Sequence, residues 1–277
     1  MRIGLDVSQH QLSWDELLGR VRYGEEAGFD GAWVFDHFKA LYGDPTGPCM
    51  EAYTLLAALA AATTRIRLGV LVTGVTYRHP ALLATEAVTV DHVSGGRLEL
   101  SLGAAWQQDE HAELGFPFPP TKERTERLEE ALTVVKSLLT ADGTTFDGRH
   151  FRLHEASYRP RPVQQPHPPI WVGAGGQRRT IPIAARHADV WHSFGSVEVL
   201  REKTAVLDDH ARRAGRDPAE ITRATNLSLS EPMDQVRATA LELRAAGFTY
   251  LVASWPEEGR QRVEEFADVL LAELTEA

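Results

Sequence analysis

The sequence predicts a (β/α)8 barrel, in which eight strand-then-helix units form one domain over residues 1–277. Short β-rich runs alternate with longer helical patterns from end to end, which indicates parallel strands joined by helical crossovers. Ala-Gly-Phe occurs at 27–29 and again at 246–248, each time between a helix and a strand, where glycine can adopt the positive φ that ends a helix. An open doubly wound sheet is the alternative. Its usual GxGxxG turn is absent after the first strand, where Ser8-Gln9-His10 stands.

The strands are expected where short runs of β-branched and other apolar residues occur, since such runs favour strands. These runs are Ile3–Val7, Gly31–Phe35, Leu68–Val72, Leu98–Leu102, Ile170–Val172, Asp189–His192, Ile221–Leu229 and Phe248–Ala253.

Capping signals and helical periodicity place a helix after each strand. Ser13 to Glu16 and Ser254 to Glu257 have the spacing of capping boxes, and Pro80 suits the first turn of a helix. Apolar residues at i, i+3 and i+4 spacing between Leu128 and Leu139 indicate a long amphipathic helix. The remaining helices are expected near Glu51–Thr63, near Arg178–His187, up to about Ala214, and over Ser230–Ala246.

Residues 141–169 interrupt the alternation between the fourth and fifth strands. Asp147-Gly148 lies between β-type residues, which is typical of a hairpin, and five prolines between Pro160 and Pro169 indicate an extended connector. We interpret this segment as an excursion from the barrel and not as a domain boundary.

Composition narrows the range of partners and the expected location of the protein. The formal net charge of −10 disfavours nucleic acid as the main partner, because such binding needs a basic surface. No run of 18 apolar residues and no signal-peptide pattern is present, so we expect a soluble, cytoplasmic protein without a membrane partner. Cys49 is the single cysteine, which excludes an internal disulfide, and we expect it to be a small buried filler.

A glycine-rich turn follows the fifth predicted strand, at Gly173-Ala174-Gly175-Gly176, and leads into Arg178 and Arg179. Backbone amides in such a turn can approach an anion, and two arginines in a first helical turn oppose the helix dipole unless an anion compensates. A phosphate site explains both features. A tight turn with solvated arginines is the alternative.

Aromatic and histidine side chains also follow the predicted strands, where barrel enzymes carry their chemistry. Flat aromatic walls suit a planar ring ligand. The residues are Tyr77, Trp106, Trp191, Trp255, His10, His37, His79 and His192. No His-x-His pair stands on the first strand, so we expect no metal, and neither a nucleophile elbow nor a carboxylate pair is evident. Asp91 and His92, late in a helix, are expected to be structural, with local hydrogen bonds or a cap.

Several longer motifs resemble the luciferase-like flavin and deazaflavin oxidoreductases, above all the branch that depends on coenzyme F420, a 5-deazaflavin. The resemblance covers roughly residues 1–230. The matching stretches are Trp33–Phe38, Gly47–Glu51, Leu68–Thr73, Tyr77–Pro80, Ser94–Leu98, Gly103–His111, Phe146–Gly148, Tyr158–Pro160 and Pro168–Gly176.

The resemblance implies a hydride-transfer enzyme that acts on a small organic substrate, with His37 as the catalytic proton donor or acceptor. Leu71-Val72 would match the family's cis peptide behind the ring, and a homodimer is the family's common state. The cofactor-binding residues that it implies are Asp36, His37, Leu71, Val72, Thr73, Gly103, Ala105, Trp106, Gly173, Ala174, Gly175, Gly176 and Arg178.

One departure from the family concerns the acid after the fourth strand. The sugar-phosphate dehydrogenases of the family carry a glutamate where this chain has Trp106, and whether Glu110 replaces it stays open. A monooxygenase that uses reduced FMN is one alternative function. A non-catalytic flavin-binding barrel is another, and the missing acid favours it.

Overall fold

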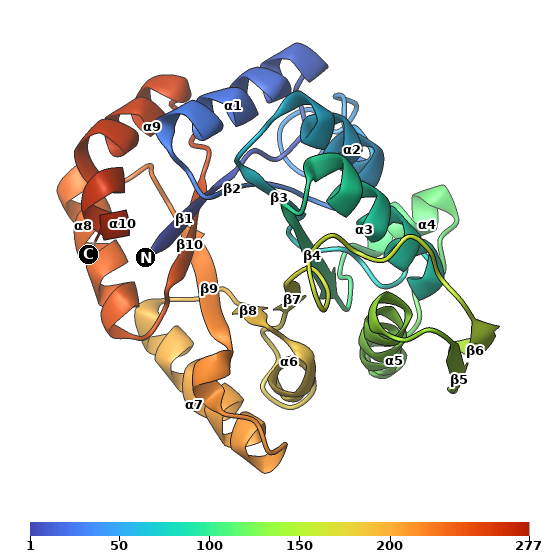
Figure 1. The fold of residues 1–277 in the computed structure, drawn as a ribbon. Coiled ribbons are helices and arrows are strands. Elements are labelled where there is room, and N and C mark those ends of the chain that lie inside the picture. The colour runs from blue at the N-terminus through green and yellow to red at the C-terminus, as the bar shows by residue number, and fades with distance from the viewer. Residues whose placement is uncertain (277) are drawn as a thin grey trace.

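The computed structural model describes residues 1–276 and has a closed barrel of eight parallel strands at its centre (Figure 1). Around the barrel the order is β1-β10-β9-β8-β7-β4-β3-β2. The barrel strands are β1 (Arg2–Asp6), β2 (Gly31–Val34), β3 (Arg67–Val70), β4 (Leu98–Gly103), β7 (Ile170–Gly173), β8 (Val190–His192), β9 (Thr222–Leu227) and β10 (Tyr250–Ser254).

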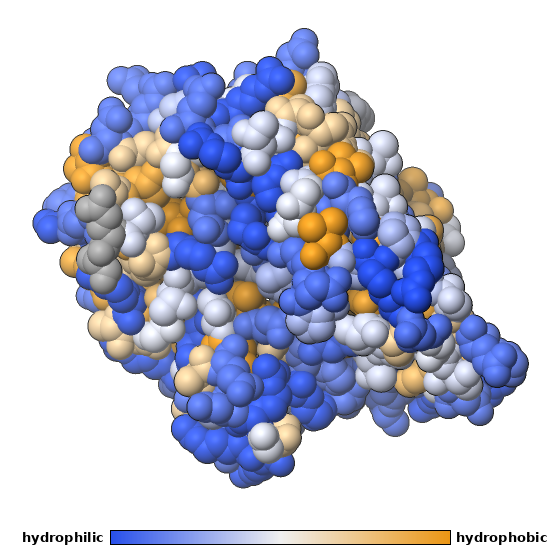
Figure 2. Space-filling model, in the orientation of Figure 1, coloured by the Kyte–Doolittle hydropathy of each residue, from blue (hydrophilic) through white to orange (hydrophobic). Residues whose placement is uncertain are grey.

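Helices surround the barrel and bury one face each against it (Figure 1). On the side drawn in Figure 2, hydrophobic residues form small groups among hydrophilic ones. The helices are α1 (Trp14–Ala27), α2 (Ala52–Ala62), α3 (Pro80–Ser94), α4 (Gln108–Leu114), α5 (Thr121–Thr140), α6 (Thr180–His187), α7 (Val197–Arg213), α8 (Met233–Ala245), α9 (Arg260–Phe266) and α10 (Ala272–Glu276), with a 3-10 turn at Pro218–Glu220 and a π-helical turn at Ala267–Leu271. Within residues 1–276, no helix is long and apolar enough to cross a membrane.

The predicted fold class is confirmed, and the predicted strands form with small shifts at their ends. Ser13 caps α1 by accepting a hydrogen bond from the Glu16 amide, and Gly28 ends that helix with a φ of 93°. The predicted hairpin forms as the antiparallel strands β5 (Thr144–Asp147) and β6 (Arg152–Ala156), which lie beside α5, outside the barrel (Figure 1). Helix α4 was not predicted, because it is short and its first turn is polar.

Three predicted helix starts are wrong, and one of them is Ser230, because α8 begins at Met233. Ser254 ends β10 and does not cap a helix, because it pairs with Asp6, and the amide of Trp255 still donates to the Asp6 carbonyl at 3.2 Å. Helix α9 begins only at Arg260. Helix α6 begins at Thr180, so Arg178 lies before its first turn and not inside it.

Asp91 and His92 are structural and their carbonyls accept the capping hydrogen bonds at the end of α3, as predicted, while their side chains contact residues distant in sequence. The buried Asp91 carboxylate accepts hydrogen bonds from the amides of Val163 and Gln164 at 2.7 and 3.0 Å. His92 Nε2 lies 2.7 Å from the carbonyl oxygen of Arg161. Together they fix the proline-rich connector against α3.

Large aromatic side chains fill the barrel below its carboxyl end. Trp33, Trp171 and Tyr250 are fully buried there, and the Trp33 and Trp171 ring centroids lie 4.2 Å apart. Gly69 makes room for them, because a Cβ at that position would lie 2.3 Å from the Trp33 ring. Trp171 Nε1 donates to the buried Glu99 carboxylate at 2.7 Å. The interior is therefore packed, and a cavity lies beyond the carboxyl ends of the strands.

Candidate active site

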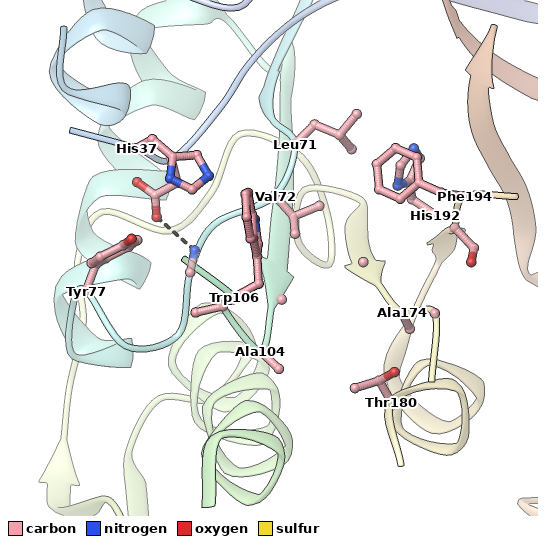
Figure 3. Close-up of a pocket in the computed structure, with 17 residues that line it drawn as sticks. His37, Leu71, Val72, Tyr77, Ala104, Trp106, Ala174, Thr180, His192 and Phe194 are labelled. Carbon is pink, nitrogen blue, oxygen red and sulfur yellow. Dashed lines mark hydrogen bonds between the residues drawn. The ribbon is translucent and has the colours of Figure 1, made fainter. Parts of the chain in front are cut away.

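A cavity of about 300 Å³ opens at the carboxyl end of the barrel. Segments after β2, β3, β4, β7 and β8 form its walls. In Figure 3, His37 and Tyr77 stand at one side, Ala174 and Thr180 at the other, and Val72 and Trp106 between them. This position agrees with the expectation that function gathers at the strand ends.

The structure brings most of the predicted binding residues to this cavity. Those that line it are Asp36, His37, Leu71, Val72, Gly103, Ala105, Trp106, Gly173, Ala174 and Gly175. Thr73 lies below the wall, fully buried, with its hydroxyl 2.8 Å from that of Tyr53. Gly176 and Arg178 lie beyond the rim, and Arg178 is exposed, with no hydrogen bond or ion pair to any residue in 1–276.

The peptide between Leu71 and Val72 is cis, as the family resemblance implied. The Val72 side chain rests over two glycines on neighbouring strands. A Cβ at Gly103 would lie 2.5 Å from Val72 Cγ2, and one at Gly173 would lie 2.7 Å from it. The two glycines therefore admit Val72 to the cavity wall, where any larger residue would displace it.

Glu110 anchors His37 from behind the cavity. Its carboxylate, 3% exposed, accepts hydrogen bonds from the amides of Phe38 and Lys39 at 2.7 and 2.9 Å, and it lies 3.0 Å from His37 Nδ1. The Tyr77 hydroxyl donates to the same carboxylate. Burial alone would raise the pKa of Glu110, but these hydrogen bonds outweigh it and lower the pKa to about 2. Glu110 is therefore ionised, and a carboxylate beside Nδ1 favours the tautomer with its proton on that nitrogen.

Asp36 is the buried acid of the cavity. Its Oδ2 accepts from the Gly74 amide at 2.8 Å and from Arg78 at 2.7 Å, while Oδ1 is buried without a hydrogen-bond partner in residues 1–276. Burial raises the pKa of Asp36, although Arg78 opposes this. Arg78 also bonds to Glu51, the N-cap of α2. An unpartnered buried oxygen is costly, so it marks a place for a ligand donor.

The glycine turn after β7 carries a cation that the sequence did not reveal. Lys203 of α7 lies beside it and is hydrogen-bonded to the segment after β8, with Nζ 2.6 Å from the Phe194 carbonyl oxygen and 3.2 Å from Ser193 Oγ. A methyl group at Gly175 would lie 3.6 Å from Nζ. Lys203 follows the turn by nearly thirty residues, and neither spacing nor motif linked the two.

Several predicted pocket residues lie elsewhere. Trp191 is a core residue, because neighbouring strand residues point to opposite faces, and it packs under the helices while His192 faces the cavity. Burial lowers the pKa of His192 to about 4, so its ring is neutral at pH 7. His79 caps α3 by accepting from the Ala81 amide. His10 and Trp255 line a second cavity.

Cys49 is half-buried, and its thiol contacts the carbonyl of His37 at 3.3 Å. Burial raises its pKa to about 11, so the group stays protonated and is a poor nucleophile. In residues 1–276 no group of three or more histidine, cysteine or acidic side chains has the arrangement of a metal site.

The chain is similar to known proteins in sequence and in fold. The chain is 32% identical to an F420-dependent glucose-6-phosphate dehydrogenase of Kineococcus radiotolerans over 87% of this chain and 71% of that protein. It is 29% identical to an FMNH2-dependent dimethylsulfone monooxygenase of Pseudomonas putida over 96% and 77%. In fold it is similar to the coenzyme F420-dependent tetrahydromethanopterin reductase of Methanopyrus kandleri, with a TM-score of 0.85, 18% identity and 99% of both chains covered. The sequence profile of the luciferase-like monooxygenases matches residues 1–275, and the chain belongs to that family.

Proposed function

We propose that this protein is an oxidoreductase that uses coenzyme F420 to transfer a hydride to or from a small organic substrate. One observation carries the proposal: His37, held by the buried Glu110, faces a cavity that runs from Val72 to a glycine turn with a lysine above it. F420-dependent enzymes among the relatives and structural neighbours support the choice of cofactor.

The residues present fit a planar ring with an anionic tail. Val72 and the backbone at Gly103 and Gly173 would hold the ring, and Asp36 Oδ1 could accept a hydrogen bond from it. The turn at Gly175, with Lys203 beside it, would hold the phosphate, although the neighbouring amides of Ala174 and Gly176 already donate to the carbonyl oxygen of His192 and to Thr180 Oγ1. When bound, F420 would supply the hydride chemistry, and the protein would orient it and handle protons.

His37 is the residue that we assign to proton transfer. Its Nδ1 is occupied by Glu110, whereas Nε2 has no hydrogen-bond partner in residues 1–276, and the ring lines the cavity. Nε2 can therefore accept a proton from a substrate hydroxyl or donate one to a carbonyl. Glu110 acts through His37 as a positioning residue and does not itself line the cavity.

The FMN alternative is supported by the dimethylsulfone monooxygenase among the relatives. The non-catalytic alternative depended on the missing acid after the fourth strand. Since Glu110 brings a buried carboxylate to His37, that argument for a mere binding barrel is weakened.

Titration of the purified protein with F420 and with FMN tests the proposal. We expect micromolar binding of F420, seen as quenching of its fluorescence, and at least tenfold weaker binding of oxidised or reduced FMN. Micromolar FMN binding without F420 binding would replace the proposal with the FMN alternative.

The anionic tail of the cofactor can be located with two variants. Lys203→Met should weaken F420 binding about tenfold, because it removes a charge beside the glycine turn. Arg178→Ala should weaken it only about twofold, since an exposed charge at the rim is screened. Isothermal titration calorimetry measures both, and a larger effect at Arg178 would move the phosphate site toward the rim.

His37→Ala should lower turnover by at least about 100-fold while changing the Kd for F420 less than about threefold, because general acid–base catalysis contributes factors of this size. Stopped-flow assays give the first value and fluorescence titration the second. If turnover were unchanged, His37 would lose its catalytic role.

Glu110→Gln should remove a pH-dependent contribution to stability. The folded-state pKa of about 2 lies below the ordinary 4.5, so the ionised carboxylate stabilises the fold above pH 4.5, and this contribution is lost as the pH falls toward 2. Urea unfolding should show the variant less stable than the wild type at pH 6, with a difference that shrinks below pH 4.5. The control Glu113→Gln removes an exposed carboxylate whose one ion pair within residues 1–276 is with Lys39, and it should show a small difference at every pH. An equally large, pH-independent loss in Glu110→Gln would contradict the assigned role.

A further inference from the structure

A second cavity, of about 640 Å³, adjoins the first at the carboxyl end of the barrel. We propose that it is the substrate compartment and that it takes an uncharged molecule with an apolar body and a hydroxyl group, and rejects phosphate esters. This assignment of a substrate class rests on the proposed function. The volume of the second cavity lies within the usual range for small-molecule sites.

Four residues line both cavities, namely His37, Leu71, Trp106 and Phe194. In Figure 3, His37 and Phe194 stand at opposite sides of the view, with Leu71 and Trp106 between them. A ligand in the second cavity would therefore contact the same imidazole that faces the first. The remaining walls come mainly from the ends of β1 and β10 and from the loop that carries Leu41 and Tyr42.

The charges around the second cavity do not suit an anion. Arg20 is the only lysine or arginine among its lining residues within 1–276. The Arg20 guanidinium already bonds to Glu16 at 3.0 Å and stacks on the Trp255 ring, 4.4 Å from its centroid. Asp6 lies in the wall and Glu257 at the exposed rim, so a phosphate group would meet two acids and one cation that is already paired.

The polar groups of the cavity suit a hydroxyl instead. Asp6 and Ser254 face each other on adjacent strands, and both Ser8 hydrogen bonds go to Asp6 Oδ1, which leaves Oδ2 without a partner in residues 1–276. Burial lowers the pKa of His10, so its ring is neutral. His10 Nδ1 and Trp255 Nε1 are buried and also lack partners in that range. A hydroxyl can donate to the carboxylate and accept from the indole, whereas a carbonyl can only accept.

Leu12, Val34, Phe35 and Leu41 form an apolar part of the wall, beside the polar side chains of Gln11 and Asn226. Such a wall favours an aliphatic or aromatic body, because burying it removes apolar surface from water. A small sugar would leave this surface poorly covered. The apolar side chains and the groups that suit a hydroxyl together indicate a largely apolar alcohol as the ligand. This ligand class distinguishes the chain from relatives named for glucose 6-phosphate.

Three probes with one body and different charges test the proposal: 4-cyclohexylcyclohexanol, the corresponding amine and the corresponding phosphate monoester. Calorimetric titration of the full chain, with and without F420, should show the alcohol binding at least tenfold more tightly than the phosphate ester and more tightly than the amine. Equal or tighter binding of the phosphate ester, a preference for the amine, or no binding of any probe would each overturn the proposal.

Two variants locate the site. Trp255→Phe should weaken alcohol binding about threefold to tenfold, as expected for one lost hydrogen bond. The matched control Trp14→Phe changes a tryptophan that lines neither cavity, and it should leave the Kd unchanged. Unchanged affinity in a folded Trp255→Phe protein would place the alcohol elsewhere and overturn the assignment.

The same preparations separate this proposal from the proposed function. F420 binding without a preference for the alcohol overturns the substrate class and leaves the cofactor in place. A preference for the alcohol without F420 binding confirms the ligand class of the cavity and overturns the F420 assignment.

Discussion

The limited space inside the barrel is the constraint on which the rest of the structure depends. Trp33, Trp171 and Tyr250 occupy the interior. Position 69 admits only glycine, because the Trp33 ring fills the space that a side chain would need there. With the interior packed, no ligand can enter from below. Both cavities therefore lie beyond the carboxyl ends of the strands, and the residues that follow the strands determine their chemistry.

The buried Glu110 carboxylate connects these strand-end segments to one another. It belongs to α4, after β4, yet it accepts from backbone amides after β2 and from Tyr77 after β3. Two loops and α4 are thereby fixed around one charge. The same contacts that hold His37 in place also keep Glu110 ionised, since each hydrogen bond stabilises the charged form.

Local patterns in the sequence predicted the barrel, the hairpin and most of the cavity wall, because strand runs, caps and glycine turns depend on near neighbours. The errors arise where more distant contacts decide. Ser254 looks like a helix cap, but its pairing with Asp6 extends the strand. Trp191 lies at the end of a strand, but successive side chains of a strand point to opposite faces, and the side chain of Trp191 points into the hydrophobic core. Glu110 lies 73 residues from His37 in the sequence. Lys203 lies on α7, far along the chain from the glycine turn that follows β7. No spacing rule connects the residues of either pair.

The distribution of charge around the barrel mouth follows from which strands supply each wall. The side formed after β7 and β8 offers backbone amides and Lys203, although the chain as a whole carries a net charge of −10. The side formed by β1 and β10 offers Asp6 and a single arginine that is already paired. In a protein that repels anions overall, an anionic ligand is held only where local donors outweigh that field. This difference supports the proposal of an anionic tail in the first cavity and an uncharged substrate in the second, and the imidazole of His37 lines both.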